Sequence, residues 1–471
     1  MRWGLSPELV RSLAARLRSF WQRYRMCFRT QTRDGGEYAF DYLSGQLRLE
    51  SKRTFANLAR TAAVSEQNMQ HFMSNSPWSA QAVFLQVLAE ISGTPALQQG
   101  GLLVLDESAE AKSGDQSVGA ARQHNGRLGK VDMSQVGTFL AYVNGPVWTW
   151  IDGELFLPEA WFAPDKADLR KRLGIPEQRK FATKVDLGWQ MIQWVKEHGL
   201  PFEALLCDDL YGRAKWFRAA LHDAGIIYMA DVPANTQVYL ERPVIAVPEK
   251  PRAPGPMPHV PHILSAPPPV TVADVAHDRE TVRQEIMVRT TERGTISGPF
   301  AFQRVWTIGD NGWERAEWLV IRWEANDTCT YSLSNAPSDV THERLALLKC
   351  SRYFGERSHQ DAKSEAGWDD LQARRYRAWE HHLALTVLAS WFVAQTKLEW
   401  AQRSQRDPDL AEQFAVDVLP ALSMANVRAL LRSVMPLPEL TPEEATRQVV
   451  KHLVNRTRSR KSRMGKHARS P

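Results

Sequence analysis

Two short apolar runs that end in acidic residues mark the centre of this chain. The run over residues 102–105 leads directly into an acidic pair that begins with Asp106, and the run over residues 201–207 leads into Asp208 and Asp209. An unbroken apolar run of this length predicts a strand that is buried on both faces. Because ligand sites in α/β sheets lie at the carboxyl ends of the strands, we expect the two carboxylates to lie together. One such pair alone is also typical of a loop, so the prediction depends on the repetition.

The surrounding pattern alternates between strands and helices. A hairpin that turns at Asn144 and Gly145 follows the first strand. Apolar spacing then predicts helices over 183–198 and 213–223. The apolar run that leads into Asp208 lies between these helices as a strand, and a further strand over 226–230 follows the second helix. The order strand, strand, strand, helix, strand, helix, strand resembles that of a ribonuclease H-like nuclease core. We therefore predict an α/β fold built on a mixed sheet.

Shifts in composition divide the chain into five predicted segments. Residues 1–98 are expected to form a helical N-terminal DNA-binding domain, and residues 99–235 the first part of the core. Residues 236–338 hold a proline-rich connector and an inserted small β domain. Residues 339–400 complete the core with a helix that carries a third acid, and residues 401–471 form a helical C-terminal region with a basic tail.

Two of these segments contain stretches of unusual composition. Prolines crowd residues 242–270, which indicates an extended connector with little fixed structure. The tail over residues 455–471 contains no acidic residue. Such a block is typical of a disordered, solvated segment, and beside a DNA enzyme it is equally typical of an arm that binds phosphates without reading sequence.

The N-terminal segment contains a candidate DNA-reading element. Residues 54–73 predict two short helices separated by a tight turn, with Ser65 as the N-cap of the second. This pair resembles a helix-turn-helix, whose second helix would present Gln67, Asn68 and Gln70 to a major groove. A small helical hairpin without a role in DNA binding fits the same pattern.

Overall composition limits the class of protein. The chain has 471 residues, 43% of them hydrophobic, and a net charge of +6, which permits a nucleic-acid partner without requiring one. Its apolar runs are much shorter than a membrane span, and the first residues lack the apolar core of a signal peptide, so we expect a cytoplasmic protein without a membrane partner. The four cysteines are scattered without C-x-x-C spacing, which favours reduced core residues over disulfides or a zinc site.

The third acid is predicted on a helix over residues 341–367. Arg352, Glu356 and Lys363 are spaced by four and seven residues, so a continuous helix would place them on one face with the carboxylate between two cations. A salt-bridged surface helix would show the same pattern. His359, His381 and His382 lack a further ligand at a usual metal-site spacing, and we expect them to be hydrogen-bonded or exposed rather than metal-bound.

Taken in order, the three acidic motifs resemble those of bacterial insertion-sequence transposases of the cut-and-paste type. Residues 105–108 are similar to the first-Asp motif of that group, and residues 207–212 to the second, in which Asp208 rather than Asp209 is the match. The resemblance extends over about residues 40 to 400. It implies a ribonuclease H-like fold with a β-strand insertion before the catalytic Glu.

The third motif resembles the signature Y-x2-R-x3-E-x6-K. Arg352, Glu356 and Lys363 match it, whereas Lys349 stands where the signature has tyrosine. The resemblance implies that Arg352 and Lys363 hold phosphates of the transposon end, and any phosphate contact by the tyrosine would pass to the Lys349 ammonium. Such contacts position DNA without reading its sequence.

The resemblance also implies the chemistry. Asp106, Asp208 and Glu356 would be the catalytic metal ligands for two Mg²⁺ ions per site, with Mn²⁺ as a substitute and Asp106 as the bridge between the ions. The protein would cleave the ends of its element and join them to target DNA, as a homodimer on double-stranded DNA in the nucleoid. A retired transposase that still binds DNA is the alternative. A glycoside hydrolase would explain the paired acids but not the basic residues around Glu356.

Overall fold

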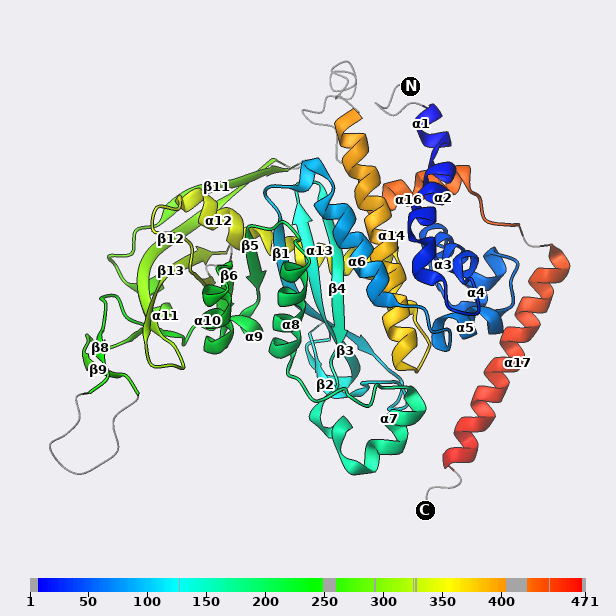
Figure 1. The fold of residues 1–471 in the computed structure, drawn as a ribbon, viewed down its shortest axis with the longest axis horizontal. Helices are drawn as coiled ribbons and strands as arrows, with labels where there is room; N and C mark the ends of the chain where they lie inside the picture. Colours follow the sequence, from blue (N-terminus) through cyan, green and yellow to red (C-terminus); the bar gives the residue numbers. More distant parts are fainter. Residues whose placement is uncertain are drawn as a thin grey trace.

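The computed structural model describes residues 7–126, 128–248, 260–291, 294–324, 326, 328–403, 422–439 and 441–467. In these ranges one large mixed sheet is flanked by helices, and a group of N-terminal helices lies at one side of it (Figure 1). The predicted α/β class with a mixed-sheet core is thereby confirmed. Among the described helices, none is long and apolar enough to cross a membrane.

The core strands follow the predicted order closely. They are β1 (Leu102–Ala111), β2 (Ala121–Asn125), β3 (Lys130–Asn144), β4 (Val147–Leu155), β5 (Ala204–Cys207) and β6 (Ile227–Val232). β3 pairs antiparallel with β1, β2 and β4, whereas β1, β5 and β6 run parallel to one another. Gly145 has a φ of 55°, as a tight hairpin turn after β3 requires. β2 lies in a polar, Gly-rich segment whose sequence predicts no strand.

The inserted strands extend the core sheet instead of forming a separate one. They are β11 (Gln284–Thr291), β12 (Gly294–Ile308), β13 (Glu314–Trp323) and β14 (Cys329–Ser334). β14 pairs antiparallel with β6, so the sheet continues in the order β11-β12-β13-β14-β6-β5-β1-β3-β2. Beside these strands, α11 (Val272–His277) contributes to a second hydrophobic cluster that includes Val305 and Leu319.

The connector before these strands is more ordered than its prolines predict. β8 (Val244–Ala246) pairs antiparallel with β9 (His262–Ser265), and β7 (Gln237–Val238) pairs with β10 (Val270–Thr271). Proline excludes central strands but allows short edge ladders of this kind. Residues 249–259 of the connector lie outside the described residues.

Helices on either side of the sheet complete the core. They are α7 (Ala167–Leu173), α8 (Lys184–Glu197), α9 (Asp209–Gly212), α10 (Lys215–Asp223), α12 (His342–Ser351) and α13 (Tyr353–Gln360). The predicted helix over 341–367 is not continuous. A turn at Arg352 separates α12 from α13, and residues 361–365 form the π-helical segment η5 (Asp361–Glu365).

A long helix joins the sheet to the N-terminal helices. α14 (Tyr376–Arg403) packs against β4 and also against α3, α5 and α6 (Figure 1). The N-terminal helices are α1 (Pro7–Arg11), α2 (Leu13–Tyr24), α3 (Gly36–Arg48), α4 (Phe55–Thr61), α5 (Glu66–Ser74) and α6 (Ala80–Ser92). The C-terminal helices are α16 (Met424–Val434) and α17 (Pro442–His467), so most of the basic tail is helical rather than disordered.

Candidate active site

The two faces of β1 are covered by different helices. A Cβ added at Gly188 of α8 would lie 2.6 Å from Leu105, and one added at Gly355 of α13 would lie 2.5 Å from Val104. Because neighbouring residues of a strand point to opposite faces, α8 and α13 pack on opposite sides of the sheet. Only glycine allows either helix to approach so closely.

The same alternation separates the two acids of the first motif. Asp106 shares the face of Val104, which α13 covers, while Glu107 shares the face of Leu105. In agreement, the Glu107 carboxylate pairs with Lys184 at the start of α8. The acid that faces the helix of the third motif is therefore Asp106.

Asp208 stands beside Asp106 on the next strand. Leu105 of β1 is paired with Cys207 of β5, so the two aspartates occupy equivalent positions one residue further along. The Asp208 carboxylate accepts a hydrogen bond from the Leu210 backbone amide at 3.0 Å and caps the short helix α9. Asp209, in contrast, forms an exposed ion pair with Arg213 at 2.6 Å.

The two aspartates differ in how readily they ionise. Burial and the negative charge of Asp106 raise the pKa of Asp208 to about 7. Burial also opposes ionisation of Asp106, but His359 and Arg352 outweigh it and hold the pKa of Asp106 below its ordinary value. Two neighbouring carboxyls with diverging pKa values are typical of sites that hold a cation or move a proton.

Glu356 lies on α13 but does not meet the aspartates directly. Its side chain is 58% exposed, and its Oε1 lies 3.3 Å from Nη2 of Arg352. The Arg352 Nε lies 3.1 Å from Oδ2 of Asp231, at the end of β6. Although burial disfavours the charged guanidinium, Asp231, Asp106 and Glu356 raise the pKa of Arg352. Arg352 is thus the cation at the centre of the acidic cluster.

The other two predicted phosphate-binding residues have acidic partners within the protein. The Lys363 ammonium lies 2.9 Å from Glu110 of β1, because the wider turn of η5 shifts Lys363 off the stripe that a regular helix would give. The Lys349 side chain is 4% exposed, and its ammonium lies 3.2 Å from Asp231. In this conformation neither ammonium is open to a phosphate.

The acids fit hard divalent cations, which prefer carboxylate oxygens. The charge of Asp106 opposes the ionisation of Asp208, its neighbour on the adjacent strand, and a cation between them would relieve that repulsion. Within the described part of the chain, no three acidic, histidine or cysteine side chains are grouped closely enough to hold one metal ion. Glu356 is paired with Arg352, so it would have to turn from that partner to complete the set.

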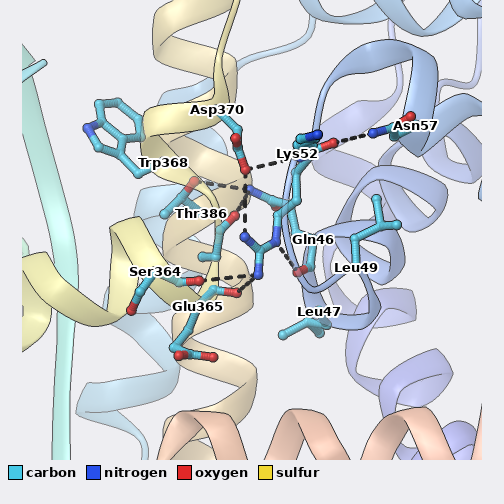
Figure 2. A network of polar contacts seen from close by, with 12 residues as sticks. Gln46, Leu47, Leu49, Lys52, Asn57, Ser364, Glu365, Trp368, Asp370 and Thr386 are labelled. Carbon is cyan, nitrogen blue, oxygen red and sulfur yellow. Dashed lines mark hydrogen bonds and ion pairs between the residues drawn. The ribbon is translucent and has the colours of Figure 1, made fainter. Parts of the chain in front are cut away.

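A buried arginine from the N-terminal helices holds the segment that follows Glu356. Arg53 is 3% exposed and donates to the Gln46 carbonyl at 2.9 Å and to the Glu365 carbonyl at 2.8 Å. Figure 2 shows the surrounding network, in which Asp370 accepts from the Arg53 backbone amide at 3.0 Å. Gln46 itself donates to Thr386 of α14 at 3.1 Å. The network ties α3, η5 and α14 together.

The candidate DNA-reading residues lie in a different part of the molecule. The Ser65 hydroxyl accepts from the Asn68 backbone amide at 3.1 Å, so the predicted N-cap of α5 is confirmed. Gln67, Asn68 and Gln70 are exposed on α5. Since α14 lies between α5 and the sheet, these side chains are not brought together with the acids (Figure 1).

The histidines divide into two kinds. His381 and His382 are buried and hydrogen-bonded, as expected. Nδ1 of His381 lies 2.9 Å from the Met73 carbonyl oxygen, and Nδ1 of His382 lies 2.8 Å from the Tyr42 hydroxyl oxygen. The expectation is wrong for His359, whose ring nitrogens are buried without a hydrogen-bond partner. Its Nε2 lies 3.6 Å from Oδ2 of Asp106.

The sequence analysis therefore did not place two residues at this site: Asp231, which it did not single out, and His359, which it expected only to be hydrogen-bonded or exposed. Each had a signal. His359 follows Glu356 by three residues and so lies on the same side of a helix. Asp231 ends an apolar run over residues 226–230, just as Asp106 and Asp208 end theirs.

Known proteins resemble this chain over most of its length. Residues 23–295, more than half of the chain, match the family model described as DDE superfamily endonuclease. This range includes Asp106 and Asp208 but ends before Glu356. The chain is also 21% identical, over 345 residues, to a probable transposase for insertion sequence element IS701 from Microchaete diplosiphon, and the match covers 72% of this chain and 77% of that relative.

Proposed function

This chain belongs to the DDE superfamily of endonucleases, and we propose that it is a transposase that cleaves the ends of an insertion sequence and joins them to target DNA. The observation that carries the proposal is the alignment of Asp106 and Asp208 at equivalent positions of two neighbouring parallel strands, with Glu356 on the helix that covers the face of Asp106.

Asp106, Asp208 and Glu356 would hold two Mg²⁺ ions, or Mn²⁺ in their place. When bound, such ions lower the pKa of an attacking water or hydroxyl and stabilise the leaving oxygen of the phosphodiester. Of the three acids, Asp106 would be the one shared by both ions, as the resemblance to transposases implies. Glu356 would leave Arg352 as DNA enters, which frees the guanidinium for a phosphate.

The remaining contacts with DNA follow from the same arrangement. Lys363 reaches a phosphate only by leaving Glu110, so its contribution depends on closure of the site around DNA. Lys349 would support the site from within rather than contact the backbone, since its ammonium is buried against Asp231. Gln67, Asn68 and Gln70 would read the element's end from α5, and two copies of the chain would hold the paired ends.

Cleavage of labelled DNA that carries the element's own ends tests this proposal. With Mg²⁺ or Mn²⁺ the native protein should nick at the end, and Glu356→Gln should lower the rate by about 10³-fold, or about 4 kcal/mol of transition-state stabilisation. Glu343→Gln is the matched control, because Glu343 is an exposed acid on the neighbouring helix α12.

Two outcomes would contradict the proposal. Tight binding to the ends without nicking by the native protein would favour the retired, DNA-binding alternative. Nicking that persists in Glu356→Gln would remove Glu356 from the catalytic set while leaving the endonuclease activity in place.

A further inference from the structure

A third aspartate lies in line with the two catalytic candidates. Cys207 of β5 is paired with Ala230 of β6, just as Leu105 of β1 is paired with Cys207. One residue beyond this row, Asp106, Asp208 and Asp231 therefore lie at equivalent positions of three neighbouring parallel strands, although β1 itself continues to Ala111. Asp231 belongs neither to the acidic triad nor to its flanking basic residues.

Asp231 differs from the other two in its partners. Its Oδ1 accepts from the Lys349 ammonium at 3.2 Å and from the Ser332 hydroxyl, and its Oδ2 lies 3.1 Å from Arg352. The Lys349 ammonium also donates to the Ser332 hydroxyl at 2.6 Å. Two cations already surround this carboxylate, so it is equipped to anchor side chains and not to accept a metal ion.

The contact with Arg352 fixes a rigid group. A guanidinium is planar and presents its donors in a fixed fork, so anchoring one edge sets the direction of the other. Asp231 binds the Nε edge, and the Nη2 atom points at Glu356, 3.3 Å away. Without Asp231, the Arg352 side chain would keep its charge but lose its orientation.

We propose that Asp231 is a positioning residue, which aims Arg352 at the catalytic Glu356 and at the phosphate that DNA brings to it. Ser332 belongs to β14, the last inserted strand, and Lys349 to α12, so the anchor also fastens the insertion to the active site. The inference rests on the proposed function, because the phosphate is that of the element's end. It also gives a role to Lys349, the residue at which this chain departs from the transposase signature.

A double-mutant cycle separates positioning from mere packing. In single-turnover nicking of the element's end, Asp231→Asn should lower the rate by about 10²-fold, as expected for a misplaced catalytic contact, while affinity for the end stays unchanged. In an Arg352→Gln background the same exchange should change the rate by less than about twofold, because Asp231 acts through Arg352. Asp209→Asn, an exposed acid after the same strand as Asp208, is the matched control.

Additive effects in that cycle would overturn the inference, as would a parallel loss of end binding and nicking. Asp231→Asn leaves a buried ammonium without its carboxylate and can prevent folding. The cycle is then repeated in a Lys349→Met background, which removes the buried charge. If nicking recovers in Asp231→Asn/Lys349→Met, Asp231 only neutralises Lys349 and the proposal is wrong.

Failure of the proposed function would give a different result. In that case the native protein does not nick, and the cycle is measured by urea unfolding of the free protein. The midpoint shift caused by Asp231→Asn should be smaller in the Arg352→Gln background, and equal shifts would show that the two side chains do not interact.

Discussion

Neighbouring acids in this chain have different roles because each faces a different environment. Asp106 faces α13 and Glu107 faces Lys184, although they are adjacent in the sequence. Asp208 is half-buried beside Asp106, whereas Asp209 pairs with Arg213 at the surface. Strand alternation decides which acid of the first pair faces α13, and the end of β5 decides which acid of the second pair lies beside Asp106. Both can be read from the sequence once the strands are placed.

A buried acid outside the active site is expected to make the stability of the protein depend on pH. Asp152 of β4 is 7% exposed, and burial, together with the charge of Glu154, raises its pKa to about 8 from an ordinary value near 3.8. Between these values the folded protein retains a proton that the unfolded chain releases. Stability from this group is therefore fully present below about pH 4 and is lost as the pH rises to about 8.

Asp152→Asn should consequently stabilise the protein relative to the native chain, and the gain should grow between pH 5 and pH 8. Urea unfolding at several pH values measures it as a difference in unfolding free energy. Asp165→Asn, an exchange at an exposed aspartate, is the control. A gain that is the same at both pH values would show that Asp152 is ionised in the folded protein.

The paired helices α4 and α5 each begin with a side-chain cap. The Thr54 hydroxyl accepts from the Asn57 amide at 3.4 Å, and the Ser65 hydroxyl accepts from the Asn68 amide at 3.1 Å, so a side chain caps each helix. Ala63 adopts a φ of 55° in the turn between them, a conformation that is costly for a residue other than glycine. The exposed polar face of α5 is thereby held at a fixed angle to α4.

If α5 reads the element's end, Gln67→Ala/Gln70→Ala should weaken binding to that end by about 1–3 kcal/mol for each base that is no longer read. Binding to unrelated DNA should remain the same, since phosphate contacts supply it. Fluorescence anisotropy with both DNAs at one salt concentration measures the ratio. Gln81→Ala, at an exposed glutamine of α6, is the control, and equal weakening on both DNAs would contradict a role in sequence reading.

The elements also show where sequence reasoning stops. Caps, the hairpin at Gly145 and the buried strands are predictable because each depends on local chemistry. The turn at Arg352 and the π-helical segment after Gln360 are not, because residues 341–367 have helical composition throughout. Arg53 has the charge that phosphate contact requires, but it is buried against carbonyls more than three hundred residues away, which no local pattern indicates.

One continuous sheet connects the inserted strands to the strands that carry or precede Asp106, Asp208 and Asp231. The strand order places β14 next to β6, so the insertion ends beside Asp231 and close to the residues that flank Glu356. Composition predicts the inserted strands but not their pairing with the core, because register between distant strands is set by tertiary packing. The same applies to the meeting of Asp106 on β1 with His359 on α13.

The arrangement of the free protein has a direct consequence for metal binding. Two acids lie together, while the third is held by Arg352 and is largely exposed. We therefore expect the complete metal site to form only when DNA draws Arg352 to a phosphate. Asp106, Asp208 and Glu356 would then share the ions.

Counting bound Mn²⁺ by electron paramagnetic resonance, with and without an uncleavable copy of the element's end, tests whether the three acids share the ions. After subtraction of the ions bound by the DNA alone, the native complex should hold two tightly bound ions per site, and the free protein should hold fewer. Glu356→Gln should lose at least one of these ions while it still binds the DNA. Equal numbers of tightly bound ions in the native and Glu356→Gln complexes would show that Glu356 does not hold an ion.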